Sequence, residues 1–147
     1  DLSTDQTIAY NDTGSSEPIS RGLQRLQDAD RIIGHNIIGY DIPVIRKLYP
    51  WFGKPAYVVD TLLLSRLYHP DMINLDKKHN WEGMPLKLYG KHSLESYGYR
   101  LNEHKGDYGS TSDWSDWSQE MEDYCIQDVN VTTKLWHHFQ PYLNGSR

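Results

Sequence analysis

A chain of 147 residues, 37% hydrophobic and 12% aromatic, is long enough to fold around one core, and this composition excludes a fully disordered or collagen-like protein. Its 20 acidic residues exceed its 15 Lys and Arg residues, and the net charge of -5 excludes a basic module that binds duplex nucleic acid through charge alone. The one cysteine, Cys125, excludes an internal disulfide and a cysteine-cluster zinc site. Because no apolar run approaches the length of a membrane span, we expect a soluble protein with no membrane partner, and the single cysteine favours a reducing, intracellular setting.

The first half of the chain predicts short strands that alternate with helices, because short apolar runs are followed by apolar residues at helical spacing. In order, we expect a hairpin remnant over 1–12 with a strand at 7–10, a helix over 19–28, a strand over 31–34, a helix over 41–48, a strand over 57–60 and a helix from 60. Asp60 is well suited to cap that last helix through its carboxylate.

The second half predicts a loop followed by two helices. Residues 71–91 lack an apolar period, and a loop of this length is more often functional than idle. Ser93 is expected to cap a short helix that runs to residue 99, and a long helix is expected over 114–139. Its expected core residues are Met121, Cys125, Val129, Leu135, Trp136 and Phe139. The order of elements predicts a layered α/β domain whose parallel strands are joined by crossovers.

Asp41 follows a strand and a glycine-containing turn at the start of a helix, which is the place where α/β sheets present ligand-binding residues. A carboxylate at this position is a candidate for chemistry. The alternative is that Asp41 only caps the helix, which would stabilise it by about 1 kcal/mol.

Asp128 shares a helical stripe with apolar residues of the last helix, and Tyr124 lies one turn before it on the same face. A buried carboxylate is costly unless it is paired, neutralised or bound to a metal, so Asp128 is a second candidate. A one-residue error in the helical frame would instead place Asp128 at the solvated edge. The sequence contains no nucleophile elbow, no P-loop, no HExxH and no dinucleotide fingerprint.

These residues resemble the 3′-5′ exonuclease domain of family A DNA polymerases, and most closely that of podovirus-type phages. Residues 35–41 (HNIIGYD) are similar to the second exonuclease motif of the DnaQ-like superfamily, and residues 60–67 (DTLLLSRL) to the block that follows it. Residues 124–128 (YCIQD) are similar to the third motif, of YxxxD form, and residues 91–101 (KHSLESYGYRL) to the intervening helix. The resemblance implies an RNase H-like mixed sheet flanked by helices.

The resemblance implies a proofreading exonuclease that removes nucleotides from single-stranded DNA 3′ ends, using two divalent cations, Mg²⁺ or Mn²⁺, held by four carboxylates. Asp41 and Asp128 would be two of these ligands, and Tyr124 would orient the attacking water. Asn36 and Tyr40 would position the frayed 3′ nucleotides. Apart from the resemblance, the lysines of the long expected loop are predicted to help hold the substrate's phosphates, with a solvated face as the alternative; they are Lys77, Lys78, Lys87 and Lys91.

The first motif of that family, a D-x-E pair on the opening strand, is not found in this sequence. We therefore expect residues 1–143 to be an exonuclease domain that lacks its N-terminal strand, with 144–147 as a tail or linker and a polymerase domain elsewhere in the full-length chain. In a phage, the site of action would be the host cytoplasm. Two alternatives are a non-catalytic exonuclease-fold module that binds DNA, and a plain α/β domain whose aspartates are caps.

Overall fold

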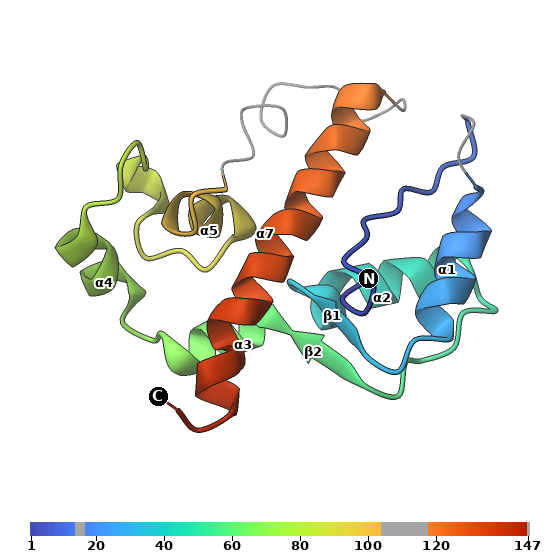
Figure 1. The fold of residues 1–147 in the computed structure, drawn as a ribbon, viewed down its shortest axis with the longest axis horizontal. Coiled ribbons are helices and arrows are strands. Elements are labelled where there is room, and N and C mark those ends of the chain that lie inside the picture. The colour runs from blue at the N-terminus through green and yellow to red at the C-terminus, as the bar shows by residue number, and fades with distance from the viewer. Residues whose placement is uncertain (14–16, 104–117, 147) are drawn as a thin grey trace.

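The computed structural model describes residues 1–13, 17–103 and 118–146 and shows a mixed α/β chain (Figure 1). Its elements are, in order, α1 (Ile19–Gln27), β1 (Ile32–Gly34), the π-helical turn η1 (Ile37–Asp41), α2 (Ile42–Leu48), β2 (Val58–Asp60), α3 (Thr61–Tyr68), α4 (Met72–His79), the 3₁₀ turn η2 (Leu86–Leu88), α5 (Leu94–Arg100) and α7 (Gln119–Leu143). The long helix α7 crosses the middle of the molecule and packs against α3 and α5.

The two strands pair in parallel, as the sequence predicts. Ile32 lies opposite Val58 and Gly34 opposite Asp60, so both strands end at the same edge. Among the described residues the sheet has these two strands only, and it is therefore parallel rather than mixed. The class α/β is confirmed, while the larger sheet of an RNase H-like fold is not observed in this part of the chain.

Two predicted helix caps are confirmed. The Asp60 carboxylate accepts a hydrogen bond from the backbone N–H of Leu62, and the Ser93 hydroxyl accepts one from the N–H of Ser96. Each satisfies a backbone donor that the first turn of a helix leaves without an intrahelical partner. These helices begin where the sequence predicts because a cap is a local interaction.

The predicted strand at 7–10 is wrong, because those residues run as an irregular segment. The Tyr10 ring lies over Gly22 of α1, so closely that a Cβ at Gly22 would be 2.7 Å from Tyr10 Cδ2. The backbone N–H of Asn11 donates to the Glu17 carbonyl, at 3.1 Å. A strand requires a partner strand, and the two-stranded sheet of the described residues supplies none for this segment.

The predicted loop at 71–91 is also wrong in part, since it contains α4 and η2. The segment folds around Asp76, which is 0% exposed. Its carboxylate accepts hydrogen bonds from Trp81 Nε1 at 2.9 Å, from the Gly90 N–H at 2.8 Å, and from Nε and Nη2 of Arg100 at 2.8 and 2.7 Å. A buried carboxylate, rather than an apolar stripe, organises these residues, so apolar periodicity does not detect them.

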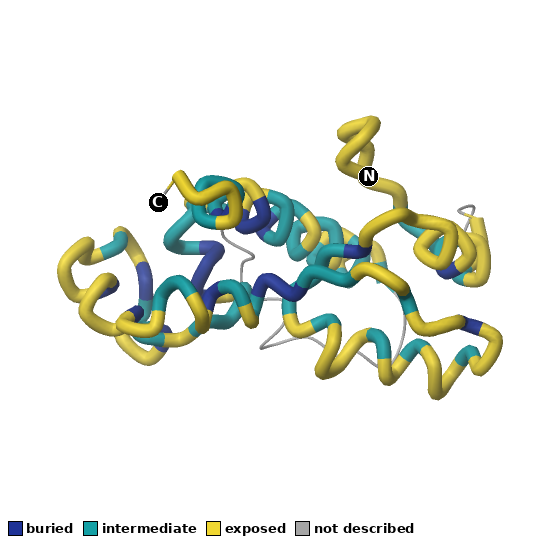
Figure 2. The backbone as a smooth tube through the Cα atoms, turned by 90° about the horizontal axis from the view of Figure 1, so that it is seen from below, coloured by how far each residue is buried: buried dark blue, intermediate teal, exposed yellow. Residues whose placement is uncertain are grey.

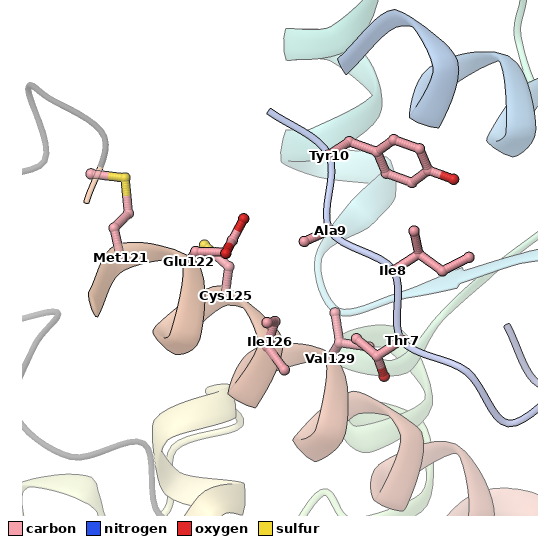
Figure 3. Close-up of a pocket in the computed structure, with 9 residues that line it drawn as sticks. All are labelled: Thr7, Ile8, Ala9, Tyr10, Met121, Glu122, Cys125, Ile126 and Val129. Carbon is pink, nitrogen blue, oxygen red and sulfur yellow. The ribbon is translucent and has the colours of Figure 1, made fainter. Parts of the chain in front are cut away.

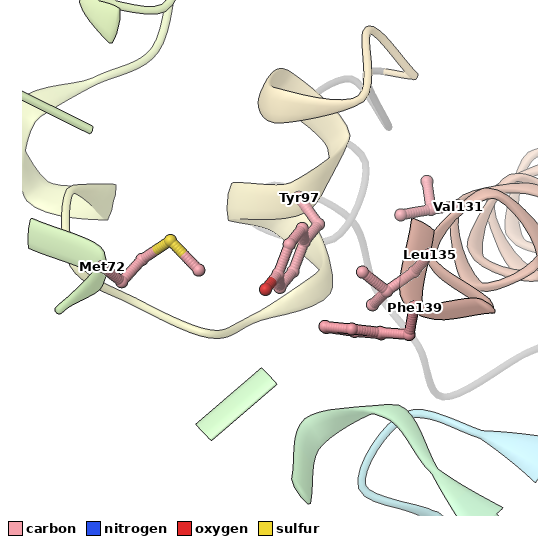
Figure 4. Packing of buried hydrophobic residues seen from close by; sticks show 5 residues of the cluster. All are labelled: Met72, Tyr97, Val131, Leu135 and Phe139. Atoms are coloured by element: carbon pink, nitrogen blue, oxygen red, sulfur yellow. The ribbon is translucent and has the colours of Figure 1, made fainter. Parts of the chain in front are cut away.

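The main apolar cluster lies where α5 meets the C-terminal half of α7 (Figure 4). It comprises Met72, Tyr97, Val131, Leu135 and Phe139. Buried residues occur in only some segments of the chain, and much of the rest is exposed (Figure 2).

The expected core of the long helix is partly wrong. Leu135, Trp136 and Phe139 are buried, but Cys125 is exposed and Val129 is 48% exposed. Met121 is only partly buried, and the first predicted residues of the helix, 114–117, lie outside the described residues.

Candidate active site

The turn after β1 carries the residues of the first candidate motif. Asn36 adopts the left-handed conformation, with φ 59°, which asparagine tolerates better than most residues. Its side chain packs over Gly39, where a Cβ would be 2.8 Å from Asn36 Oδ1. The N–H of Tyr40 donates to the Asn36 carbonyl at 3.0 Å, and the Tyr40 side chain projects into solvent, 62% exposed. Asn36 and Tyr40 thus share an accessible surface next to Asp41.

Asp41 does not cap the helix it precedes. It has helical dihedral angles, φ -63° and ψ -47°, and its side chain makes no capping hydrogen bond. The π-helical turn η1 leads directly into α2, so the backbone donors at the start of α2 face the preceding turn instead of a side chain. The alternative interpretation of Asp41 as a simple helix cap is therefore wrong.

Asp41 lies in a negative electrostatic environment made by carboxylates of two other elements. The Asp41 residue is exposed, but partial desolvation of its carboxyl raises the pKa, and the charges of Asp60, at the end of β2, and Asp128, on α7, raise it further, against a backbone hydrogen bond that lowers it. A raised pKa means that ionised Asp41 destabilises the fold at neutral pH, and that this cost disappears as the pH falls through the folded pKa. A bound cation would offset the same repulsion.

Asp128 lies on the core side of α7, as predicted. It is half-buried and shares its stripe with Val131 and Leu135, which are both 0% exposed. Tyr124, half-buried, lies one turn earlier on the same helix. The structure therefore brings both predicted carboxylates into one electrostatic neighbourhood, although they come from motifs that are far apart in sequence.

The four lysines lie away from this neighbourhood. All are exposed: Lys77 and Lys78 in the last turn of α4, Lys87 in η2 and Lys91 just after it. Along the long axis, α4 lies near one end of the molecule and α1 near the other, with α7 between α4 and α2 (Figure 1). The lysines and Asp41 therefore form two separate surfaces.

Hard cations such as Mg²⁺ bind carboxylate oxygens, so the side-chain chemistry of Asp41 and Asp128 fits such an ion. Within residues 1–13, 17–103 and 118–146, however, no three Asp, Glu, His or Cys side chains are grouped so that they could hold one metal ion. The described residues thus provide suitable ligands but not a complete site.

A hollow of about 250 Å³ lies elsewhere, between residues 7–10 and the N-terminal half of α7 (Figure 3). Its lining is mainly apolar and includes Ile8, Met121 and Val129. Neither Asp41 nor Asp128 lines it. This hollow results from the irregular course of the N-terminal segment, and it does not coincide with the candidate carboxylates Asp41 and Asp128.

His35 is a residue of this region to which the sequence analysis gave no role. Its Nδ1 lies 2.9 Å from Thr61 Oγ1, and its Nε2 lies 2.7 Å from the carbonyl oxygen of His92. The ring therefore ties the turn after β1 to the start of α3 and to the segment before α5. In the sequence, the only indication that His35 has this linking role is its position next to Asn36.

Comparison with known proteins relates the chain to part of phage DNA polymerases. The sequence is homologous to a region of phage DNA polymerase, and no family model matches it. It is 30% identical over 173 residues to the DNA-directed DNA polymerase of Escherichia phage T7, covering 98% of this chain and 25% of that protein. It is 34% identical over 142 residues to the DNA-directed DNA polymerase of Enterobacteria phage T3, covering 77% of this chain and 20% of that protein. The chain thus spans a quarter or less of the length of these relatives.

In the described part of the chain, no helix combines the length and the apolar character that crossing a membrane requires.

Proposed function

We propose that residues 1–143 are the 3′-5′ exonuclease module of a phage-type DNA polymerase, which removes nucleotides from single-stranded DNA 3′ ends in the host cytoplasm. The observation that carries the proposal is the placement of Asp41, which does not cap its helix and lies in the field of Asp60 and Asp128. The homology to phage DNA polymerases supports it, and residues 144–147 would be a tail or linker to further domains.

In this proposal Asp41 and Asp128, together with a D-x-E pair contributed from outside these residues, would hold two divalent cations, Mg²⁺ or Mn²⁺. The cations would supply charge neutralisation at the scissile phosphate and a lowered pKa of a bound water. Tyr124 would orient the attacking water through its hydroxyl. Asn36 and Tyr40, which share an exposed surface beside Asp41, would hold the frayed 3′ nucleotides by packing and stacking.

The proposal predicts that the 147-residue chain alone binds Mn²⁺ weakly and releases 3′ nucleotides slowly or not at all, because only two of the four expected carboxylates are present. The measurement is a Mn²⁺ titration of the purified chain, following nucleotide release from a 3′-labelled single strand. The same polypeptide extended upstream through a D-x-E strand should give metal-dependent release. Robust release by the 147-residue chain, abolished by Asp128→Ala, would show that a carboxylate such as Asp1 or Asp5 completes the site.

A second candidate function is a non-catalytic module that binds DNA, which is favoured by the absence of a complete metal cluster among the described residues. The two functions differ in the coding sequence upstream of Asp1. A D-x-E within a short apolar strand there favours catalysis. Its absence from the gene, together with single-strand binding that no metal converts into hydrolysis, would favour the binding module.

The four exposed lysines are expected to contact the phosphates of bound DNA at a distance from the carboxylates. Replacing Lys77, Lys78, Lys87 and Lys91 by Gln should weaken single-strand binding and flatten its dependence on salt, because fewer counterions are displaced on binding. The measurement is a salt titration of affinity by fluorescence anisotropy. A matched control replaces Lys47 and Lys54, which are exposed and lie outside this segment. An unchanged salt slope in the quadruple variant would assign these lysines to solvent.

A further inference from the structure

We infer that Asp60 is a positioning residue of the candidate active site, which holds the turn of residues 34–41 in the conformation that presents Asp41 towards Asp128. The inference rests on the proposed function for its catalytic consequence, but its geometric part concerns the turn itself. The sequence predicted only that Asp60 caps α3.

The Asp60 carboxylate accepts hydrogen bonds from two segments of the chain. Oδ1 accepts from the N–H of Leu62 at 3.0 Å, which is the helix cap, and also from the N–H of Asn36 at 2.9 Å. Oδ2 accepts from the N–H of Ile38 at 3.1 Å. The Asp60 residue is 6% exposed, so water does not replace these bonds easily. A carboxylate that only capped α3 would need just one of these three hydrogen bonds, the one from Leu62.

The choice of a carboxylate at this position is informative. A Ser or Thr cap would satisfy the Leu62 N–H without adding charge, whereas a carboxylate is costly to bury. The second oxygen is what a hydroxyl cap lacks, and it is the atom that accepts from Ile38. The hydrogen bonds that the Asp60 carboxylate makes to the turn therefore explain why a residue that is costly to bury stands at this position.

The sheet register places Asp60 where it can do this. Gly34, the last residue of β1, pairs with Asp60, so the turn that follows β1 begins directly beside the Asp60 side chain. The next residue, Thr61, is 0% exposed and contacts His35 at 2.9 Å, so the start of α3 holds the turn at His35, Asn36 and Ile38. Asp41 lies only three residues after the last of these contacts.

The test separates the cap from the hold on the turn. Asp60→Ser keeps a capping oxygen for Leu62 but cannot reach both turn amides, so amide hydrogen exchange at Asn36 and Ile38 should accelerate about tenfold or more while Leu62 stays protected. Asp60→Asn keeps Oδ1 but replaces Oδ2 by an amide nitrogen, which donates hydrogen bonds and so cannot accept one from the Ile38 N–H. Exchange should then accelerate at Ile38 alone, which tests the same hold in a variant of nearly identical size.

Ser93→Ala is the matched control, because it removes an equivalent cap from α5: the Ser93 hydroxyl bonds to Ser96, while the neighbouring His92 carbonyl that contacts His35 of the turn is backbone and is kept. It should leave exchange at Asn36 and Ile38 unchanged. If exchange at both amides in Asp60→Ser stays within about twofold of the parent chain, Asp60 is a cap only and the inference is wrong.

The catalytic consequence is measured in the polypeptide that includes the D-x-E strand. Asp60→Ser should lower kcat and also raise KM for single-stranded DNA, since the turn that Asp60 holds carries Asp41 together with Asn36 and Tyr40, which are proposed to hold the nucleotides. Ser93→Ala should change neither. A kcat equal to the parent's in Asp60→Ser would overturn the positioning role. A parent polypeptide with no nuclease activity contradicts the proposed function instead, and the exchange data still decide whether Asp60 holds the turn.

Discussion

Asp41→Ala and Asp128→Ala are each expected to lower metal-dependent exonuclease turnover on the order of 10³-fold in a polypeptide that carries the D-x-E pair. The reason is that fixed negative groups at a cation site act on charge that develops in the transition state, and the loss of one such preorganised group is of this size. The measurement is single-turnover release of 3′ nucleotides at saturating Mg²⁺.

The controls for these two substitutions test whether the loss is chemical or structural. Asp30→Ala removes an exposed carboxylate away from the site and should leave turnover unchanged. Asp41→Ala should not destabilise the fold, because Asp41 makes no capping bond and its raised pKa reflects desolvation of the carboxyl and repulsion by Asp60 and Asp128, both of which the substitution removes. Near-parental turnover in both Asp41→Ala and Asp128→Ala would show that the assignment of these carboxylates is wrong.

Asp76→Ala is expected to lower the free energy of unfolding by about 3–5 kcal/mol, the usual cost of breaking a buried ion pair by removing one partner. The Arg100 side chain that remains is 5% exposed and would lose both of its bonds to the carboxylate. Trp81 Nε1 and the Gly90 N–H would also lose their acceptor. Urea unfolding of the two proteins, followed by tryptophan fluorescence, measures the difference.

The same ion pair predicts a dependence on pH. Burial by itself would raise the pKa of Asp76, but the hydrogen bonds and charge of Arg100, with the bonds from Gly90 and Trp81, outweigh burial and lower it. The stability that Asp76 provides is therefore present above the pKa of an unfolded aspartate, about 3.9, and is lost as the pH falls through the lower folded value. Asp76→Asn should flatten the acid limb of the stability curve.

Glu103→Ala provides the comparison with an exposed ion pair. Glu103 and Lys134 lie 3.0 Å apart with side chains 28% and 48% exposed, so this substitution should cost about 0–1 kcal/mol. A loss in Asp76→Ala no larger than in Glu103→Ala would show that the Asp76 contacts do not organise residues 71–91.

The sequence by itself determined the elements that local interactions decide. The strands before His35 and at 58–60, the helix caps at Asp60 and Ser93, and the stripe that turns Asp128 inward all follow from neighbours within a few residues. The candidate carboxylates also follow from local patterns: Asp41 from a strand, a turn and a helix start, and Asp128 from an apolar stripe that includes a carboxylate.

The tertiary structure decided what depends on distant partners. Residues 7–10 have the alternation of a strand but no strand to pair with among the described residues, and α4 depends on contacts of Asp76 with Gly90 and Arg100, 14 and 24 residues away. The second role of Asp60 likewise required the parallel register, which places its carboxylate beside a turn 22 to 24 residues earlier. Hydrogen bonds between segments leave no period in a sequence, so only the folded chain reveals which carboxylate caps a helix, which one holds a turn and which one organises a segment.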